Sequence, residues 1–155
     1  MKQKKIIVFM PSIEGGGVEK NFFIVTNYLS SKNNNVSVIT SCKNAKIGLK
    51  KKIKIICTNS SIIESFGRRS KFLICLYHLF KEILSNKNST VLCFQGIAYC
   101  TILCSILSTK VIIRSNSSPS GWSKNFFKIF FYKKIYGMAN TIIVNSFAFK
   151  NELKK

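Results

Sequence analysis

Apolar residues along the chain alternate between short continuous runs and longer runs with helical spacing. The short runs are rich in Ile and Val and are bounded by Gly, Pro, Asn or Ser, a pattern typical of buried strands. In the longer runs, apolar residues recur every three or four positions, as in helices that pack on a core. We predict strands at 5–10, 36–40, 53–57, 90–94, 110–114 and 141–144, and helices at 18–31, 70–85, 96–107, 122–138 and from 147 onward.

The order of these elements predicts the fold class. Repeated strand–helix–strand units cross over in a right-handed sense and build a parallel sheet. We therefore expect one Rossmann-like α/β domain over residues 1–155, doubly wound, with a mainly parallel sheet and helices on both faces. Ligands of such sheets bind beyond the carboxyl ends of the strands, so the residues that follow each strand are the first candidates for function.

The segment 70–85 has the clearest helical pattern. On a helical wheel one face is apolar and carries Phe72, Leu73, Leu76, Leu79, Phe80, Ile83 and Leu84. The opposite face carries Lys71, Cys75, His78 and Glu82. We expect the apolar face to meet the core and the other face to lie in solvent. The basic segment 42–52 between two strands is predicted to be a loop.

Composition narrows the chemistry. The chain has 25 Lys and Arg but only 5 Asp and Glu, which gives a formal net charge of +20. Hydrophobic residues still make up 46% of the sequence, which indicates a folded domain and not a disordered basic tail. The sequence has no Asp, which excludes a Ser-His-Asp triad and Asp-based divalent-metal sites. Three interpretations of the charge stay open: an anionic membrane surface, nucleic acid, and compositional drift.

The six cysteines show no Cys-x-x-Cys pair, and the lone His78 has no matching ligand set nearby, so we expect no metal site. Most of the cysteines lie in apolar runs, where a free thiol behaves as a small hydrophobic group. We expect reduced cysteines in a cytoplasmic protein, with peripheral attachment to the inner face of the membrane as an open alternative. The apolar run 6–10 is too short for a signal peptide.

A glycine loop joins the first predicted strand to the first predicted helix. It contains Glu14, Gly15, Gly16 and Gly17. Glycines let backbone N–H groups approach a ligand closely, and the helix N-terminus beyond them favours an anion. The loop matches neither the dinucleotide fingerprint nor the P-loop pattern. A tight turn without a ligand is the alternative interpretation.

Polar residues also follow the predicted strand 110–114. Arg114, Ser115, Asn116 and Ser117 offer one cation and several hydrogen-bonding groups, which suit sugar hydroxyls or a phosphate. The alternative is a helix cap with Arg114 packed over the end of the strand.

The predicted helix 122–138 mixes aromatic and basic residues, which is typical of a helix at a membrane interface. Its membrane-facing candidates are Trp122, Lys124, Lys128, Lys133 and Lys134. A helix packed between the sheet and another element would have the same composition. Such mixing also suits single-stranded nucleic acid, but the sequence has no signature of an RNA-binding module, so we expect nucleic acid less than a membrane surface.

Segments 5–40 and 111–153 together resemble the N-terminal domain of glycosyltransferase family 4, whose members build capsule and surface polysaccharides. The resemblance rests on the glycine loop followed by Gly-Val-Glu-Lys at 17–20, on Arg-x-Asn at 114–116, and on Asn-Ser at 145–146 before a helix with Lys and Glu. It implies a GT-B architecture, in which two Rossmann-like domains face a cleft. It also implies retaining transfer from a nucleotide sugar to a glycan or lipid-linked acceptor, without a metal or other cofactor.

By this resemblance the chain is the acceptor-side domain, and Gly15 to Gly17 face the donor phosphates. Glu14, Arg114, Asn116 and Ser146 are then acceptor or cleft residues. Many members of the family carry a His after the fourth strand, where this chain has Gln95, so Gln95 is the substitute candidate for a catalytic residue. The paired glutamates of the family's C-terminal donor domain have no counterpart here, so we expect a partner chain or further domain to supply them.

Two functions from other classes stay open. One is a non-catalytic subunit that recruits a split glycosyltransferase to the membrane. The other is a basic module that binds nucleic acid through its charge.

Overall fold

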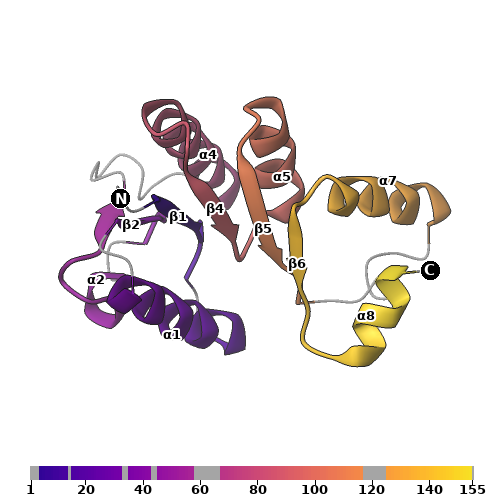
Figure 1. Ribbon diagram of the computed structural model, residues 1–155, viewed down its shortest axis with the longest axis horizontal. Helices are drawn as coiled ribbons and strands as arrows, with labels where there is room; N and C mark the ends of the chain where they lie inside the picture. Colours follow the sequence, from indigo (N-terminus) through magenta and orange to yellow (C-terminus); the bar gives the residue numbers. More distant parts are fainter. Residues whose placement is uncertain are drawn as a thin grey trace.

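The computed structural model describes residues 4–13, 15–32, 35–42, 45–57, 67–116 and 125–154 (Figure 1). In chain order the elements are β1 (Ile6–Phe9), α1 (Gly17–Lys32), β2 (Val36–Ile39), α2 (Ala45–Gly48), β3 (Lys54–Ile56), α4 (Arg68–Ser85), β4 (Thr90–Cys93), α5 (Ile97–Ile106), β5 (Lys110–Arg114), α7 (Phe126–Gly137), β6 (Thr141–Ile143) and α8 (Phe147–Lys154). All six predicted strands are present. The prediction of a loop over 42–52 was wrong in part, because this segment contains the short helix α2.

The strands form a single parallel sheet with the order β3-β2-β1-β4-β5-β6. Val8 of β1 pairs with Val38 of β2 on one side and with Leu92 of β4 on the other. The chain therefore builds outward from β1 in both directions, and the loops after β1 and β4 leave the sheet on either side of this reversal. The prediction of a doubly wound Rossmann-like sheet is confirmed.

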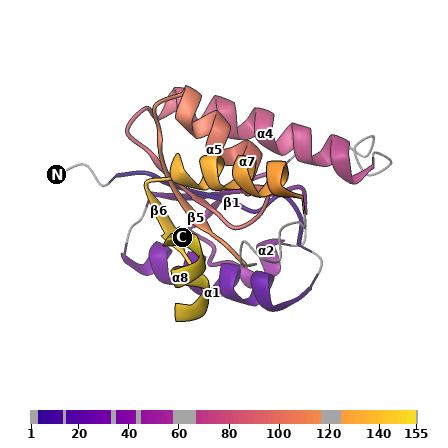
Figure 2. The ribbon, with the colours of Figure 1, turned by 90° about the vertical axis from the view of Figure 1, so that its right-hand side faces the viewer.

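Two hydrophobic cores lie on the two faces of the sheet, because side chains alternate along each strand. On one face Phe9, Cys93 and Ile113 pack with buried residues of α4, α5 and α7. On the other face Val8 and Leu92 pack with buried residues of α1 and α2. Figure 2 shows these two helix layers on opposite sides of the sheet. No described helix combines the length and apolarity that a membrane span requires.

The orientation of α4 differs from the prediction. Cys75, Leu79 and Ile83 face the core, while Leu73 and Phe80 are exposed. The predicted apolar face was therefore wrong for part of its residues. The helix is rotated about its axis so that Cys75 meets the sheet instead of solvent.

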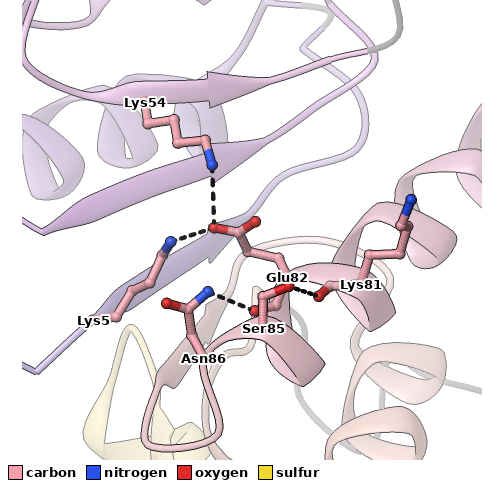
Figure 3. A network of polar contacts seen from close by, with 6 residues as sticks. All are labelled: Lys5, Lys54, Lys81, Glu82, Ser85 and Asn86. Atoms are coloured by element: carbon pink, nitrogen blue, oxygen red, sulfur yellow. Dashed lines mark hydrogen bonds and ion pairs between the residues drawn. The ribbon is translucent and has the colours of Figure 1, made fainter.

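In this orientation α4 also brings a shared carboxylate to the sheet. Glu82 forms an ion pair with Lys5, and both side chains are only 12% exposed. Lys54 approaches the same oxygen, Glu82 Oε1, at 3.7 Å. Figure 3 shows both lysines reaching Glu82 from the strand side of α4. Because an ammonium that is mostly removed from water is costly without a counter-charge, the pair stabilises the contact of the Glu82 side of α4 with the sheet.

All six cysteines are free thiols. Cys75, Cys93, Cys100 and Cys104 are buried, which confirms that most of the cysteines serve as small core residues. Burial raises the pKa of the Cys75 thiol to about 12, and the neighbouring Cys57 adds to the rise. Cys42 and Cys57 are half-buried.

Candidate functional site

A cavity of about 810 Å³ lies beyond the carboxyl ends of β1, β2 and β4. This volume is in the range of pockets that bind small molecules. The loops after these strands, the first turns of α4 and the start of α5 line it with Pro11, Ser12, Ile13, Ser41, Cys42, Arg69, Lys71, Phe72, Leu73, Gln95, Gly96 and Tyr99. The cavity thus occupies the place where a ligand of this fold class is expected.

Hydrogen bonds between the strand ends fix the polar side of the cavity. The backbone N–H of Ser12 donates to Gln95 Oε1 over 2.9 Å, which joins the loops after β1 and β4. Ser41 Oγ donates to the carbonyl of Pro11 over 2.6 Å and ties the end of β2 to the same loop. Gln95, the candidate for a catalytic residue, therefore has its carbonyl oxygen committed to the backbone. In the described part of the chain its Nε2 has no hydrogen-bond partner, so this group can donate to a ligand.

Aromatic rings form the apolar wall. The ring centroids of Phe72 and Tyr99 are 5.4 Å apart, and Phe72 also packs edge-on against Phe9 at 6.2 Å. Gly96 makes this packing possible, since a Cβ at this position would lie 2.3 Å from Cε2 of Phe72. Gly96 also has φ +71°, a conformation that favours glycine. The aromatic wall therefore depends on a glycine at the start of α5.

Cations lie at the α4 side of the same cavity. Arg69 and Lys71 come from the first turn of α4 and line the cavity next to Phe72 and Leu73. None of the described residues that line the cavity is a carboxylate. A ligand with an anionic group and an apolar part matches this division into a cationic and an aromatic side.

A second cavity of about 440 Å³ lies on the other side of Gln95, Gly96 and Tyr99, which line both cavities. Asn116, the predicted cleft residue, lines this second cavity. Tyr136 closes it from α7 and exchanges a hydrogen bond of 2.7 Å with Ser115 Oγ. Burial raises the pKa of the Tyr136 phenol, and the hydrogen bond with Ser115 opposes this rise.

Arg114 lines neither cavity and points to the α1 face of the sheet. Its guanidinium lies 5.7 Å from the ring centroid of Phe94, whose ring packs edge-on against Phe22 of α1. One guanidinium nitrogen, Nη2, donates to Asn145 Oδ1 over 3.1 Å. The other, Nη1, is buried and has no hydrogen-bond partner among the described residues. Such an unpaired donor is costly, which makes Arg114 a candidate for contact with an anion.

The glycine loop lies at the same α1 face but lines neither cavity. Gly15 has φ +87°, a conformation that a side chain would disfavour, and Gly15, Gly16 and Gly17 are exposed. Gly17 begins α1, and its carbonyl accepts a hydrogen bond of 2.8 Å from Asn21 Nδ2. Glu14 lies outside the described residues.

The remaining predicted positions are separate from the cavities. Ser146 Oγ accepts a hydrogen bond of 3.2 Å from the backbone N–H of Phe149, so Ser146 caps α8. Lys128, Lys133 and Lys134 are exposed on α7. Trp122 and Lys124 lie outside the described residues. No group of three or more His, Cys or Glu residues in the described part of the chain is arranged to hold a metal ion.

The α4 and α5 side of the cavity was not predicted from the sequence. Arg69, Phe72 and Tyr99 lie within helices, not directly after strands, so a search of strand ends does not find them. The two arginines at the start of α4 could have indicated this side of the cavity from the sequence. Basic residues are unfavourable in the first turn of a helix, so their presence there points to a role other than helix stability.

No protein-family model matches the sequence, and no curated protein matches it. Among solved structures, the fold is similar to that of UGT73P12 from Glycyrrhiza uralensis, which was solved in complex with glycyrrhetinic acid 3-O-monoglucuronide. The TM-score is 0.63 at 8% sequence identity, over 97% of this chain and 46% of that one. UGT73P12 is a GT-B glycosyltransferase, so the chain has a glycosyltransferase-like fold and spans about half the length of that protein.

Proposed function

We propose that the chain is the acceptor-binding half of a retaining glycosyltransferase of family 4. The enzyme would transfer a sugar from a nucleotide sugar to a cell-surface glycan or a lipid-linked acceptor. A second Rossmann-like domain, in the same or a partner chain, would complete the donor site. The observation that carries this proposal is the 810 Å³ cavity of a glycosyltransferase-like fold. It lies where the strand order reverses between β1 and β4, and it has a cationic side and an aromatic wall.

We assign the acceptor and the donor to opposite faces of the sheet, at the carboxyl ends of its strands. On the cavity side, Arg69 and Lys71 would hold an anionic group of the acceptor, and Gln95 Nε2 would donate to the reacting sugar or acceptor hydroxyl. On the α1 side, the exposed glycine loop from Gly15 to Gly17 and the buried Nη1 of Arg114 are suited to the donor phosphates. Uncharged N–H donors and one arginine fit a transfer that does not rely on a metal.

Alkylation of Cys42 tests acceptor binding. Cys42 lines the cavity, whereas Cys57 is half-buried elsewhere and serves as an internal control. A polyprenyl-diphosphate monosaccharide should slow the reaction of Cys42 with iodoacetamide and leave that of Cys57 unchanged. Arg69→Gln should weaken this protection about tenfold, since a hydrogen bond to a charged group contributes roughly 1.5–3 kcal/mol.

Two outcomes would contradict the proposal. Equal protection of both cysteines, or of neither, would show that the acceptor does not occupy the cavity. Robust sugar transfer by the 155-residue chain alone, measured with labelled nucleotide sugars, would contradict the need for a second domain. A membrane-recruiting subunit without an acceptor site also predicts no protection of Cys42.

A further inference from the structure

The three helices of one layer carry many exposed apolar side chains. This layer consists of α4, α5 and α7, which pack on the same face of the sheet (Figure 2). We define the outer helix face by its exposed apolar residues Leu73, Tyr77, Phe80, Leu84, Tyr99, Ile106, Phe127, Phe130, Phe131 and Met138. Soluble monomers rarely expose so many large apolar side chains on one helix layer, so this face indicates an interaction surface.

The spacing places these residues in stripes along the helices. On α4, Leu73, Tyr77, Phe80 and Leu84 follow one another at intervals of four, three and four, so they lie in one row. On α7, Phe127, Phe130 and Phe131 form a second row. The residues of these rows do not belong to the hydrophobic core, because other residues of both helices pack on the sheet.

The charges on the outer helix face all have one sign. Arg69, Lys81, Lys128, Lys133 and Lys134 belong to α4 and α7. Two of the lysines extend over exposed rings: Lys81 Nζ lies 5.4 Å from the centroid of Tyr77, and Lys134 Nζ lies 5.2 Å from that of Phe130. Glu82 is the single carboxylate in α4, α5 and α7, and it is turned toward the sheet.

We propose that the outer helix face docks on an anionic lipid bilayer. Aliphatic and aromatic side chains would enter the interface, while the lysine stems extend their ammonium groups to lipid phosphates. A second copy of the chain fits less well, since two such faces would bring cations together. Nucleic acid would leave the aliphatic residues of the rows unused, because stacking engages only the aromatic ones.

The outer helix face is continuous with the acceptor cavity. Leu73 and Tyr99 belong to both, and they are 63% and 62% exposed. A docked molecule would therefore hold the mouth of its cavity at the membrane surface, where a lipid-linked acceptor could enter sideways. This step rests on the proposed function, whereas the docking itself does not.

Vesicle co-sedimentation tests the docking. The 155-residue chain should bind vesicles of equal parts phosphatidylcholine and phosphatidylglycerol, and it should bind vesicles of phosphatidylcholine alone far more weakly. The triple variant Phe127→Ser, Phe130→Ser and Phe131→Ser should bind about a thousandfold more weakly, at roughly tenfold for each ring withdrawn from the interface. Changing both Lys128 and Lys133 to Gln should lower the affinity for these vesicles about fivefold per lysine.

The chain offers a matched control on the opposite layer. Ile24 and Tyr28 of α1 are 57% and 61% exposed, similar to Phe130 and Phe131 at 53% and 55%. The variant with Ser at both α1 positions should keep wild-type vesicle affinity. Circular dichroism checks that each variant folds. The substitutions Leu73→Ser and Leu84→Ser in the row on α4 give a second set of test variants for vesicle binding.

Three outcomes would overturn the docking proposal. The first is equal loss of vesicle binding in the α1 control and the α7 variant. The second is vesicle binding that the serine substitutions on α7 and α4 do not change. The third is RNA binding tighter than vesicle binding and lost in the same variants, which would identify nucleic acid as the partner. Failure of Cys42 protection with vesicle binding intact would refute the proposed function alone.

Discussion

Replacement of Gly96 by Ala probes the aromatic wall of the cavity. The new Cβ would lie 2.3 Å from Cε2 and 2.7 Å from Cζ of Phe72, so the ring has to move. Ala at φ +71° costs about 1–2 kcal/mol in backbone strain. Displacing the ring weakens its contacts with Phe9 and Tyr99, each worth about 0.5–1.5 kcal/mol. We expect Gly96→Ala to lower the free energy of unfolding by about 2–5 kcal/mol.

Urea unfolding in a double-mutant cycle separates the two causes. In the background Phe72→Ala the ring is gone, so only the backbone strain of about 1–2 kcal/mol should remain for Gly96→Ala. Gly137→Ala is the control, because a Cβ there meets nothing within 4 Å and φ is not positive. This control should leave stability unchanged or raise it by up to about 1 kcal/mol. Equal effects of Gly96→Ala with and without the Phe72 ring would refute the steric reasoning.

Two further predictions concern charged groups. Glu82→Gln should lower the free energy of unfolding by about 2 kcal/mol, because the Lys5 ammonium, only 12% exposed, loses its carboxylate. Lys54→Gln should cost less than about 0.5 kcal/mol, since Lys54 is 65% exposed; equal losses in urea unfolding would contradict this. Burial lowers the pKa of His78 below 6.5, and Lys81 lowers it further. The unfolded chain therefore binds the proton more tightly, and stability should fall as the pH decreases through about 6.5. His78→Gln should show a smaller fall in Tm from about pH 7.5 to about pH 5.5, whereas an unchanged fall would exclude this contribution.

The sheet could be predicted from the sequence because each strand is an uninterrupted apolar run. Parallel strands buried on both faces leave this pattern independently of their neighbours, and the run 110–114 is an example. The orientation of α4 could not be predicted in the same way. Its apolar residues surround more than half of the helix, so the wheel allows two orientations. In the orientation found, Cys75, Leu79 and Ile83 pack on the sheet and Glu82 meets Lys5, which lies 77 residues away in the sequence.

The candidate site was predictable where a strand end determines it. Gln95 and Asn116 follow β4 and β5 and line the cavities. Arg114 follows the same rule but points to the opposite face, because its position in β5 places its side chain with Phe94 on the α1 side. Alternation along a strand determines the face on which a side chain lies, whereas the end of a strand indicates only the edge of the sheet. Arg69 and Tyr99 depend on how α4 and α5 pack, which no local pattern records.

The scarcity of acids connects the fold to the proposed docking. With only 5 carboxylates in the chain, the direction of a single one decides the electrostatic field of a whole helix layer. Lys5 and Lys54 draw Glu82 toward the sheet, and the same rotation turns Leu73 and Tyr77 outward. The orientation of α4 thus accounts for both the exposed apolar row and the uniform positive charge around it. A net charge of +20 alone would attract any polyanion, whereas apolar rows with lysines beside them favour a bilayer over nucleic acid.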